Sequence, residues 1–235
     1  MHAPYMLLWL EAPLQSWGCD SKFGRRDSLP FPSKSGVLGL ICCALGAGGE
    51  QQALLAELST GDMQVVAYGP AAPGDRPPLL RDFQMVGSGY DDRDRWQTLL
   101  IPKTCEGKKP AMGGGPKLTH RYYVQDMAFA VLLQLPADQA ARIAHYLHAP
   151  VWDLYLGRKC CVPTEFIYQG TFAQAEEAEA RAAGLAAAKS RRFSFRVLEG
   201  EHEGDLMTLN DVPLQFGEHK RYRDRRVTLQ TWQAS

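Results

Sequence analysis

The chain has 235 residues and equal numbers of basic and acidic side chains, so its formal net charge at pH 7 is zero. Hydrophobic residues make up 45% of it and charged residues 22%, which is ordinary for a globular protein that can bury a core. Zero net charge excludes a strongly basic nucleic-acid binder and leaves room for a locally basic face. The first apolar run stops at Glu11 and has no positive region before it. We therefore expect a cytoplasmic protein with neither signal peptide nor membrane span.

Hydrophobic periodicity and turn residues predict strands and helices in an alternating order. In chain order they are a strand at 5–10, helices at 35–45 and 53–58, a strand at 63–68 with a hairpin partner at 79–86, a polar excursion at 87–122, a strand at 127–135, a helix at 138–147, a strand at 166–172, a helix at 173–189, and strands at 193–198 and 226–232. This order predicts an α+β fold with a ferredoxin-like βαββαβ core at residues 1–172 and a short α/β extension at 173–235. The excursion is too rich in Gly and Pro for a helix and too long for an ordinary loop, so we expect a functional or mobile arm.

The segment from Ala12 to Gly46 joins a basic loop to the start of a helix. Ser33 and Ser35 come just before the apolar run, serine is a preferred N-cap residue, and the positive end of a helix suits phosphate. The surrounding loop adds four cations and two flat aromatic rings on which a base could stack: Lys22, Arg25, Arg26 and Lys34, with Trp17 and Phe23. The alternative is an ordinary basic loop whose Trp17 belongs to the core. Both interpretations remain open on this segment alone.

Basic residues also gather in three later runs, at 100–125, 189–196 and 220–226, while acids concentrate elsewhere. Such segregation in a neutral chain favours a one-sided basic surface that binds a polyanion, most commonly nucleic acid.

The six cysteines form two adjacent pairs, Cys42-Cys43 and Cys160-Cys161, and two single residues. None has zinc-like spacing, so we expect reduced thiols and no metal or other cofactor.

Several ordered blocks of this sequence are familiar together. They are APLQSWG, FPSKSGVLGLICCALG, RDFQ, HRYYVQDMAFAV, LYLGRKCCVPTEFIYQG and the terminal PLQF…RDRRV. In this order they resemble the CasD-type subunits of Cascade, the type I-E CRISPR interference complex, which belong to the RAMP superfamily. The resemblance covers essentially the whole chain, and the PLQSWG and LYLGRKCCVP blocks are its most specific parts.

The resemblance implies a modified RNA-recognition domain with a β-hairpin thumb, placed at 87–122, that reaches across the guide RNA. It also implies a subunit that caps the 5′ handle of crRNA, contacts the backbone subunit and the large PAM-reading subunit, and lies near target DNA at the PAM-proximal end. The tip Gly113-Gly114-Gly115-Pro116 departs from the family pattern. Trp96 and Trp152 are candidates for subunit contacts, with core burial the favoured role for Trp152.

The expected RNA-binding residues come from the basic loop, the excursion and the LGRK turn. At that turn Gly157 permits a positive φ next to two cations; a solvated helix C-cap is the alternative, and the resemblance favours RNA contact. The full set is Gln15, Trp17, Lys22, Phe23, Arg25, Arg26, Ser33, Lys34, Ser35, Lys108, Lys109, Lys117, Arg121, Gly157, Arg158 and Lys159.

An enzyme is the competing hypothesis, because related RAMP proteins cleave pre-crRNA without metal. His120, Tyr122, Tyr123 and Lys117 could supply an acid, a base and a cation for attack by a 2′-OH. Alternate residues of a strand face opposite sides, so proximity in sequence is weak evidence for such a site. The type I-E subunit leaves cleavage to a separate nuclease, so we expect no catalytic residues here.

Overall fold

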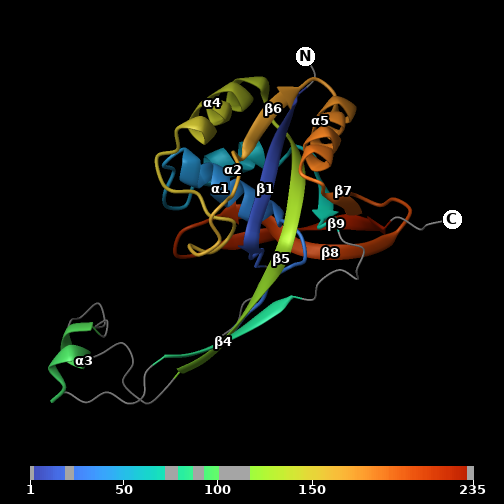
Figure 1. Cartoon of the computed structure of the whole chain (residues 1–235). Helices are drawn as coiled ribbons and strands as arrows, with labels where there is room; N and C mark the ends of the chain where they lie inside the picture. The colour runs from blue at the N-terminus through green and yellow to red at the C-terminus, as the bar shows by residue number, and fades with distance from the viewer. Residues whose placement is uncertain (1–2, 19–23, 72–78, 87–92, 101–116, 232–235) are drawn as a thin grey trace.

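The computed structural model describes residues 3–18, 24–71, 79–86, 93–100 and 117–231. Its framework is one sheet with the strand order β6-β1-β5-β3-β7-β9-β8, antiparallel between neighbours (Figure 1). These strands are β1 (Tyr5–Gln15), β3 (Met63–Gly69), β5 (Lys117–Gln134), β6 (Tyr168–Phe172), β7 (Arg192–Glu199), β8 (Asp205–Gln215) and β9 (Arg221–Thr231). Helices α1 (Lys34–Ala44), α2 (Gln52–Leu58) and α4 (Ala137–His148) cover one face, and α5 (Ala175–Ala188) covers the other (Figure 1).

The central strands are buried on both faces, which explains their uninterrupted apolar runs. In β1, Leu8 and Leu10 pack in the core beneath α1, while Leu7 and Trp9 pack in the smaller core beneath α5. The α5 side of that second core is lined by small residues one turn apart: Ala178, Ala182 and Ala186. Small side chains at this spacing let the helix approach the sheet closely.

Strand β5 is long enough to serve two parts of the molecule. Its C-terminal half pairs with β1 and β3 inside the body, and its N-terminal half pairs with β4 (Leu80–Val86) in a hairpin that projects from the body (Figure 1). The short strand β2 (Arg25–Arg26) pairs in parallel with the projecting half. The predicted pairing of 63–68 with 79–86 is therefore wrong: both edges of β3 are occupied, by β5 and β7, and β4 uses the free edge that β5 offers outside the body.

Two further differences concern segments whose sequence signal is misleading. Helix α3 (Arg95–Leu100) lies within the excursion, for which the sequence predicts no helix, and its six residues include neither Gly nor Pro. Residues 117–122 belong to β5, and the rest of the excursion, 87–92 and 101–116 with the Gly-rich tip, lies outside the described residues. Strand β8 is missing from the predicted elements because it is an edge strand with many exposed polar positions, which hide its alternation. Together β7, β9 and β8 continue the central sheet. Among the described helices, none is both long and apolar enough to cross a membrane.

Candidate functional site

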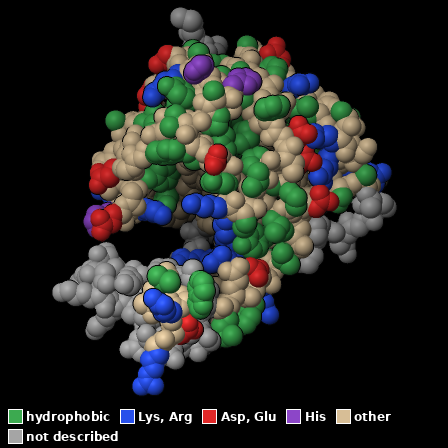
Figure 2. All heavy atoms as spheres, turned by 60° about the vertical axis from the view of Figure 1, so that its left-hand side comes forward, with side chains coloured by type: hydrophobic (Ala, Val, Ile, Leu, Met, Phe, Trp, Pro, Cys, Tyr) green, Lys and Arg blue, Asp and Glu red, His purple; other side chains and the backbone are tan. Residues whose placement is uncertain are grey.

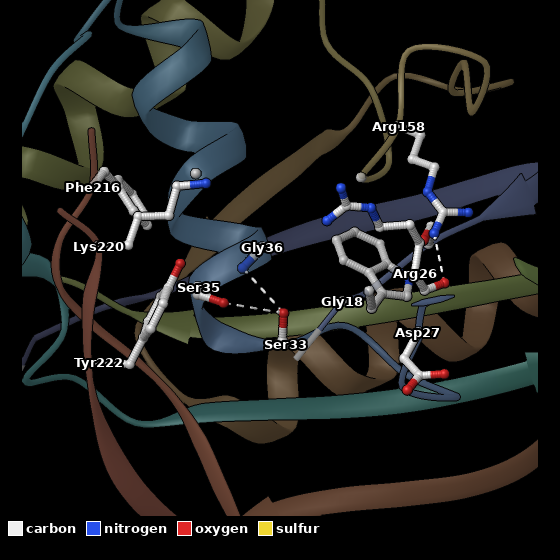
Figure 3. Close-up of a pocket in the computed structure, with 14 residues that line it drawn as sticks. Gly18, Arg26, Asp27, Ser33, Ser35, Gly36, Arg158, Phe216, Lys220 and Tyr222 are labelled. Atoms are coloured by element: carbon white, nitrogen blue, oxygen red, sulfur yellow. Dashed lines mark hydrogen bonds between the residues drawn. The ribbon is translucent and has the colours of Figure 1, made fainter. Parts of the chain in front are cut away.

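A cleft of about 430 Å³ lies where the first turn of α1 meets the end of β1, the strand β2 and the tip of the β8–β9 hairpin. Figure 3 shows the hairpin residues on one side, Arg26 and Arg158 on the other, and the first turn of α1 between them. The lining residues are Ser16, Trp17, Gly18, Arg26, Asp27, Ser33, Ser35, Gly36, Gly39, Gly157, Arg158, Phe216, Lys220 and Tyr222. Three of these are cationic and one is acidic, so the cleft carries a positive excess.

The floor of the cleft is the N-terminus of α1. Ser33 is the N-cap, and its Oγ accepts a hydrogen bond from the Gly36 N–H at 3.2 Å, as predicted from the sequence. The Ser35 hydroxyl lies 3.4 Å from the same oxygen. A helix start carries a partial positive charge, and in this turn the Lys34 N–H donates to the buried Asp211 carboxylate at 2.7 Å. The positive charge that faces the cleft therefore comes mainly from Arg26, Arg158 and Lys220.

One wall is built where the PLQSWG and LYLGRKCCVP blocks pack against each other. The Ser16 N–H donates to the Leu156 carbonyl at 3.0 Å. Gly157 has φ +96°, and a Cβ atom there would lie 1.7 Å from the Ser16 carbonyl oxygen. Leu156 and Cys161 are fully buried and anchor the loop. These blocks, far apart in sequence, therefore form one structural unit in which only glycine fits at position 157.

Arg158 is the cation that joins this loop to the neighbouring strands. Its guanidinium donates to the Tyr122 carbonyl at 3.1 Å and to the Arg26 carbonyl at 2.9 Å. It also lies over the Tyr123 ring, 4.4 Å from the centroid. Arg158 thus ties β2 to β5 while it lines the cleft.

Four of the expected contact residues are buried: Gln15, Trp17, Ser33 and Lys34. Trp17 and Ser33 still line the cleft, whereas Gln15 and Lys34 do not. Gln15 is fully buried; its amide donates to the Met127 carbonyl at 2.6 Å and its Oε1 accepts the Trp17 indole N–H at 3.2 Å. Trp17 is 1% exposed, so the core interpretation of this residue is correct. Lys34 is also 1% exposed, and its ammonium binds the Gly61 carbonyl at 2.7 Å and Glu199 at 3.0 Å. Its interpretation as a phosphate contact is wrong, because the sequence does not reveal an acidic partner 165 residues away.

Burial lowers the pKa of Lys34, and the Glu199 carboxylate only partly offsets this effect. The buried ammonium is thus held by its ion pair and is a structural cation.

The other expected residues that the structure describes lie in or near the cleft or in the β4–β5 hairpin. Arg25 and Arg26 project from β2; Arg25 pairs with Asp27 at 2.9 Å and lies over the Tyr122 ring. Ser33 and Ser35 line the cleft, whereas Lys159 is exposed beyond it. Arg121 is half-buried opposite Asp82 in the β4–β5 hairpin, and Lys117 begins β5. Four expected RNA-binding residues lie outside the described residues: Lys22, Phe23, Lys108 and Lys109.

The basic run at 189–196 does not join this surface, and acidic side chains of the described residues pair with three of its four cations, all but Arg192. Lys189 pairs with Glu11 and Glu165, Arg191 with Glu11 and Asp126, and Arg196 with Glu179. Figure 2 shows Lys and Arg side chains gathered over the hollow between the body and the projecting hairpin. The predicted one-sided basic surface therefore rests on the cleft and its surroundings, without the run at 189–196.

The hairpin wall supplies residues absent from the expected set: Phe216, Lys220 and Tyr222. Burial raises the pKa of Tyr222 above its ordinary 10.0, so its hydroxyl remains protonated even further above neutral pH than that of an exposed tyrosine. Lys220 is exposed and makes no hydrogen bond or ion pair within the described residues. The basic run at 220–226 and the PLQF…RDRRV block indicate a functional region here. They do not show which of its cations face the cleft.

Of the residues considered for RNA cleavage, His120 and Tyr123 do not share a site. Tyr123 is 3% exposed and lies beneath Arg158, whereas the His120 ring packs 5.2 Å from Phe83. In the hairpin register, His120 pairs with Phe83 and Tyr123 with Leu80, so the two residues point to opposite faces of the ribbon.

An antiparallel α+β sheet with a basic cleft at a helix start defines a class of protein suited to binding nucleic-acid backbones. The sequence then gives the family: the chain belongs to the CRISPR-associated protein family Cas_Cas5, whose model matches residues 5–228. This membership confirms the resemblance found in the ordered sequence blocks.

Individual relatives agree with this assignment. The chain is 29% identical over 173 residues to "CRISPR system Cascade subunit CasD" of Escherichia coli (strain K12), a match that covers 71% of this chain and 70% of the relative. A solved structure titled "CRISPR RNA-guided surveillance complex" contains a chain with TM-score 0.70 and 26% identity, covering 97% of this chain and 89% of that chain. Another, "Crystal structure of Cas protein", has TM-score 0.60 and 25% identity, covering 97% and 94%.

Proposed function

We propose that this chain is a non-catalytic RNA-binding subunit of a Cascade-type CRISPR surveillance complex and that its cleft holds the 5′ handle of crRNA. The observation that carries the proposal is the cleft itself, where three cations, Arg26, Arg158 and Lys220, surround the first turn of α1. Cations and backbone N–H groups bind phosphate without reading the base sequence. A subunit that holds one end of an RNA in a fixed position needs contacts of this kind. The family membership and the named relatives support this choice of ligand.

We further infer that β6-β1-β5-β3, with α1 and α4, is a ferredoxin-like unit and that the β4–β5 hairpin is the base of a thumb. One face of the hairpin carries exposed apolar side chains: Phe83, Met85 and Leu118. Such a face can pack on bases or on a neighbouring subunit, because leaving apolar side chains in contact with water does not stabilise the protein. We infer that this face of the hairpin crosses the guide RNA. Its neighbours would be the backbone subunit, the large PAM-reading subunit and target DNA.

The salt dependence of RNA binding tests the role of the cleft. Arg26→Ala and Lys220→Ala should each weaken binding of labelled repeat-derived RNA. Each should also reduce the slope of log affinity against log salt, by about 0.7 for each phosphate that is no longer neutralised. Arg181→Ala, an exposed cation on α5, is the matched control and should change neither quantity. An unchanged slope in both cleft variants would mean that these cations are merely solvated and that the RNA binds elsewhere.

The absence of catalysis has its own test. A metal-independent nuclease would cleave repeat RNA in EDTA, leave a 2′,3′-cyclic phosphate, and lose this activity in His120→Ala or Tyr123→Phe. We expect the wild type and His120→Ala to leave the RNA intact under the same conditions. Specific cleavage by the wild type alone would replace the subunit proposal with an endoribonuclease.

A further inference from the structure

A cluster of four charges, in which three side chains are buried and that of Glu199 is 26% exposed, lies directly behind the cleft. It contains Lys34 and Arg225 as cations and Asp211 and Glu199 as anions. The Asp211 and Lys34 side chains are each 1% exposed, and that of Arg225 is 5% exposed. Ion pairs so well shielded from water are held in one geometry, because moving either partner leaves an uncompensated charge.

Asp211 faces α1 from the buried side of β8. The strand alternates regularly up to this point, with Leu209 and Asp211 buried and Asn210 exposed between them. The pairing of β8 with β9 shifts register between Asn210 and Val212, directly at Asp211. The Asp211 Oδ2 accepts the backbone N–H of Lys34 at 2.7 Å. Lys34 is the first residue of α1, so Asp211 occupies one of the N–H groups at the helix start.

Arg225 completes the connection from the opposite strand. Its Nε and Nη2 donate to the two oxygens of Asp211 at 2.7 and 2.9 Å, a bidentate pair with fixed orientation. The same hairpin then continues to its tip, where Phe216, Lys220 and Tyr222 form one wall of the cleft. The hairpin is thus fastened to the helix whose first turn forms the floor.

We propose that Asp211 and Arg225 are positioning residues for RNA binding: they fix the distance between the Lys220 wall and the start of α1. This inference rests on the proposed function of the cleft. Neither residue lines the cleft, so both act through the groups that do. Within the described residues, no hydrogen bond or ion pair joins Asp211 to Lys220 directly. An energetic coupling between them would therefore have to pass through the hairpin.

A double-mutant cycle on the full-length chain tests the proposal. Binding of a labelled RNA carrying the repeat of the same CRISPR locus is measured for wild type, Asp211→Ala, Lys220→Ala and the double variant. We expect Asp211→Ala to weaken binding about tenfold, the order of one charge-assisted hydrogen bond. In its background, Lys220→Ala should have almost no further effect, because the wall is already displaced. A merely structural loss would change the folded fraction and leave the two effects additive once binding is expressed per folded molecule.

Further variants keep the test decisive if Asp211→Ala does not fold. Asp211→Asn keeps an oxygen that can accept the Lys34 N–H and should restore part of the affinity. Arg225→Lys keeps the charge but loses the bidentate fork and should reproduce the loss. The control is Glu201→Gln, which removes an exposed ion pair with Arg226 on β9 and should leave affinity unchanged.

The two proposals fail in different ways. If Lys220→Ala and Arg26→Ala weaken binding but the Asp211 variants do not, or if the cycle is additive, the positioning role is overturned and the proposed function stands. If neither Arg26 nor Lys220 affects binding, the cleft is not the RNA site and both proposals fall.

Discussion

At residue 157 the backbone conformation and the space available both demand glycine. The φ of +96° is unfavourable for any L side chain, and the Ser16 carbonyl occupies the position of a Cβ. We predict that Gly157→Ala lowers the free energy of unfolding by at least about 2 kcal/mol. It should also weaken RNA binding, since Ser16 and Arg158 move with the loop. Chemical denaturation measures the first effect.

Gly184 provides the matched control. It lies within α5, and a methyl group added there would meet no other atom within 4 Å. Gly184→Ala should therefore raise the free energy of unfolding by up to about 1 kcal/mol, through helix propensity alone. Equal stability changes at both positions would contradict the steric argument for Gly157.

Glu11 makes stability depend on pH. Burial alone would raise the pKa of Glu11, but hydrogen bonds from Trp9, Arg191 and Lys189 outweigh it and lower the pKa below its ordinary 4.5. The unfolded chain therefore binds a proton more readily than the folded one, and the stabilisation is complete above the ordinary pKa. It should be lost as the pH falls through the lowered value. Glu11→Gln should flatten the acid limb of the stability curve, whereas Glu203→Gln, at an exposed position, should not.

At the scale of helices and strands, sequence signals that span a few residues predict the structure of those same residues. The Ser33 cap and the apolar run behind it predict α1 within one residue, because capping and periodicity act within a few positions. The prediction for the pairing of β4 is wrong because that pairing depends on which strand edges the assembled sheet leaves open. Lys34 shows the same limit for the site: its burial depends on Glu199 and Gly61, which only the fold brings near.

Arg158 supports the short strand β2 in addition to its pairing with β5. Its two residues, Arg25 and Arg26, pair with β5, and the Arg158 guanidinium holds the Arg26 carbonyl from the loop side. We predict that Arg158→Ala speeds hydrogen exchange of the backbone amides at residues 24–29 by at least about tenfold. Weakly paired segments open locally without global unfolding. Amides of β9 should keep their protection in the same experiment, and a uniform increase across the chain would instead indicate global destabilisation.

At the scale of the whole molecule, the apolar surface exceeds what an isolated chain needs. Trp152, for which core burial is the favoured expectation, is 49% exposed, and Trp96 on α3 is 71% exposed. Phe166 is 77% exposed on the loop before β6. Large exposed aromatics are enriched at protein interfaces, where they contribute much of the binding energy. The positive cleft and these apolar positions together fit one copy held between RNA and neighbouring proteins.

The exposed aromatic side chains predict an assembly behaviour that can be measured directly. Co-expressed with the other proteins of its CRISPR locus, the chain should elute in a ribonucleoprotein whose mass by light scattering accounts for a single copy. Trp152→Ser should reduce its recovery in that particle while changing the free energy of unfolding of the isolated chain by less than about 1 kcal/mol, because the ring is half exposed. A melting experiment on the isolated variant separates lost assembly from lost folding. A stable homodimer with no affinity for the co-expressed proteins would contradict the prediction, since the exposed aromatics would then serve self-association.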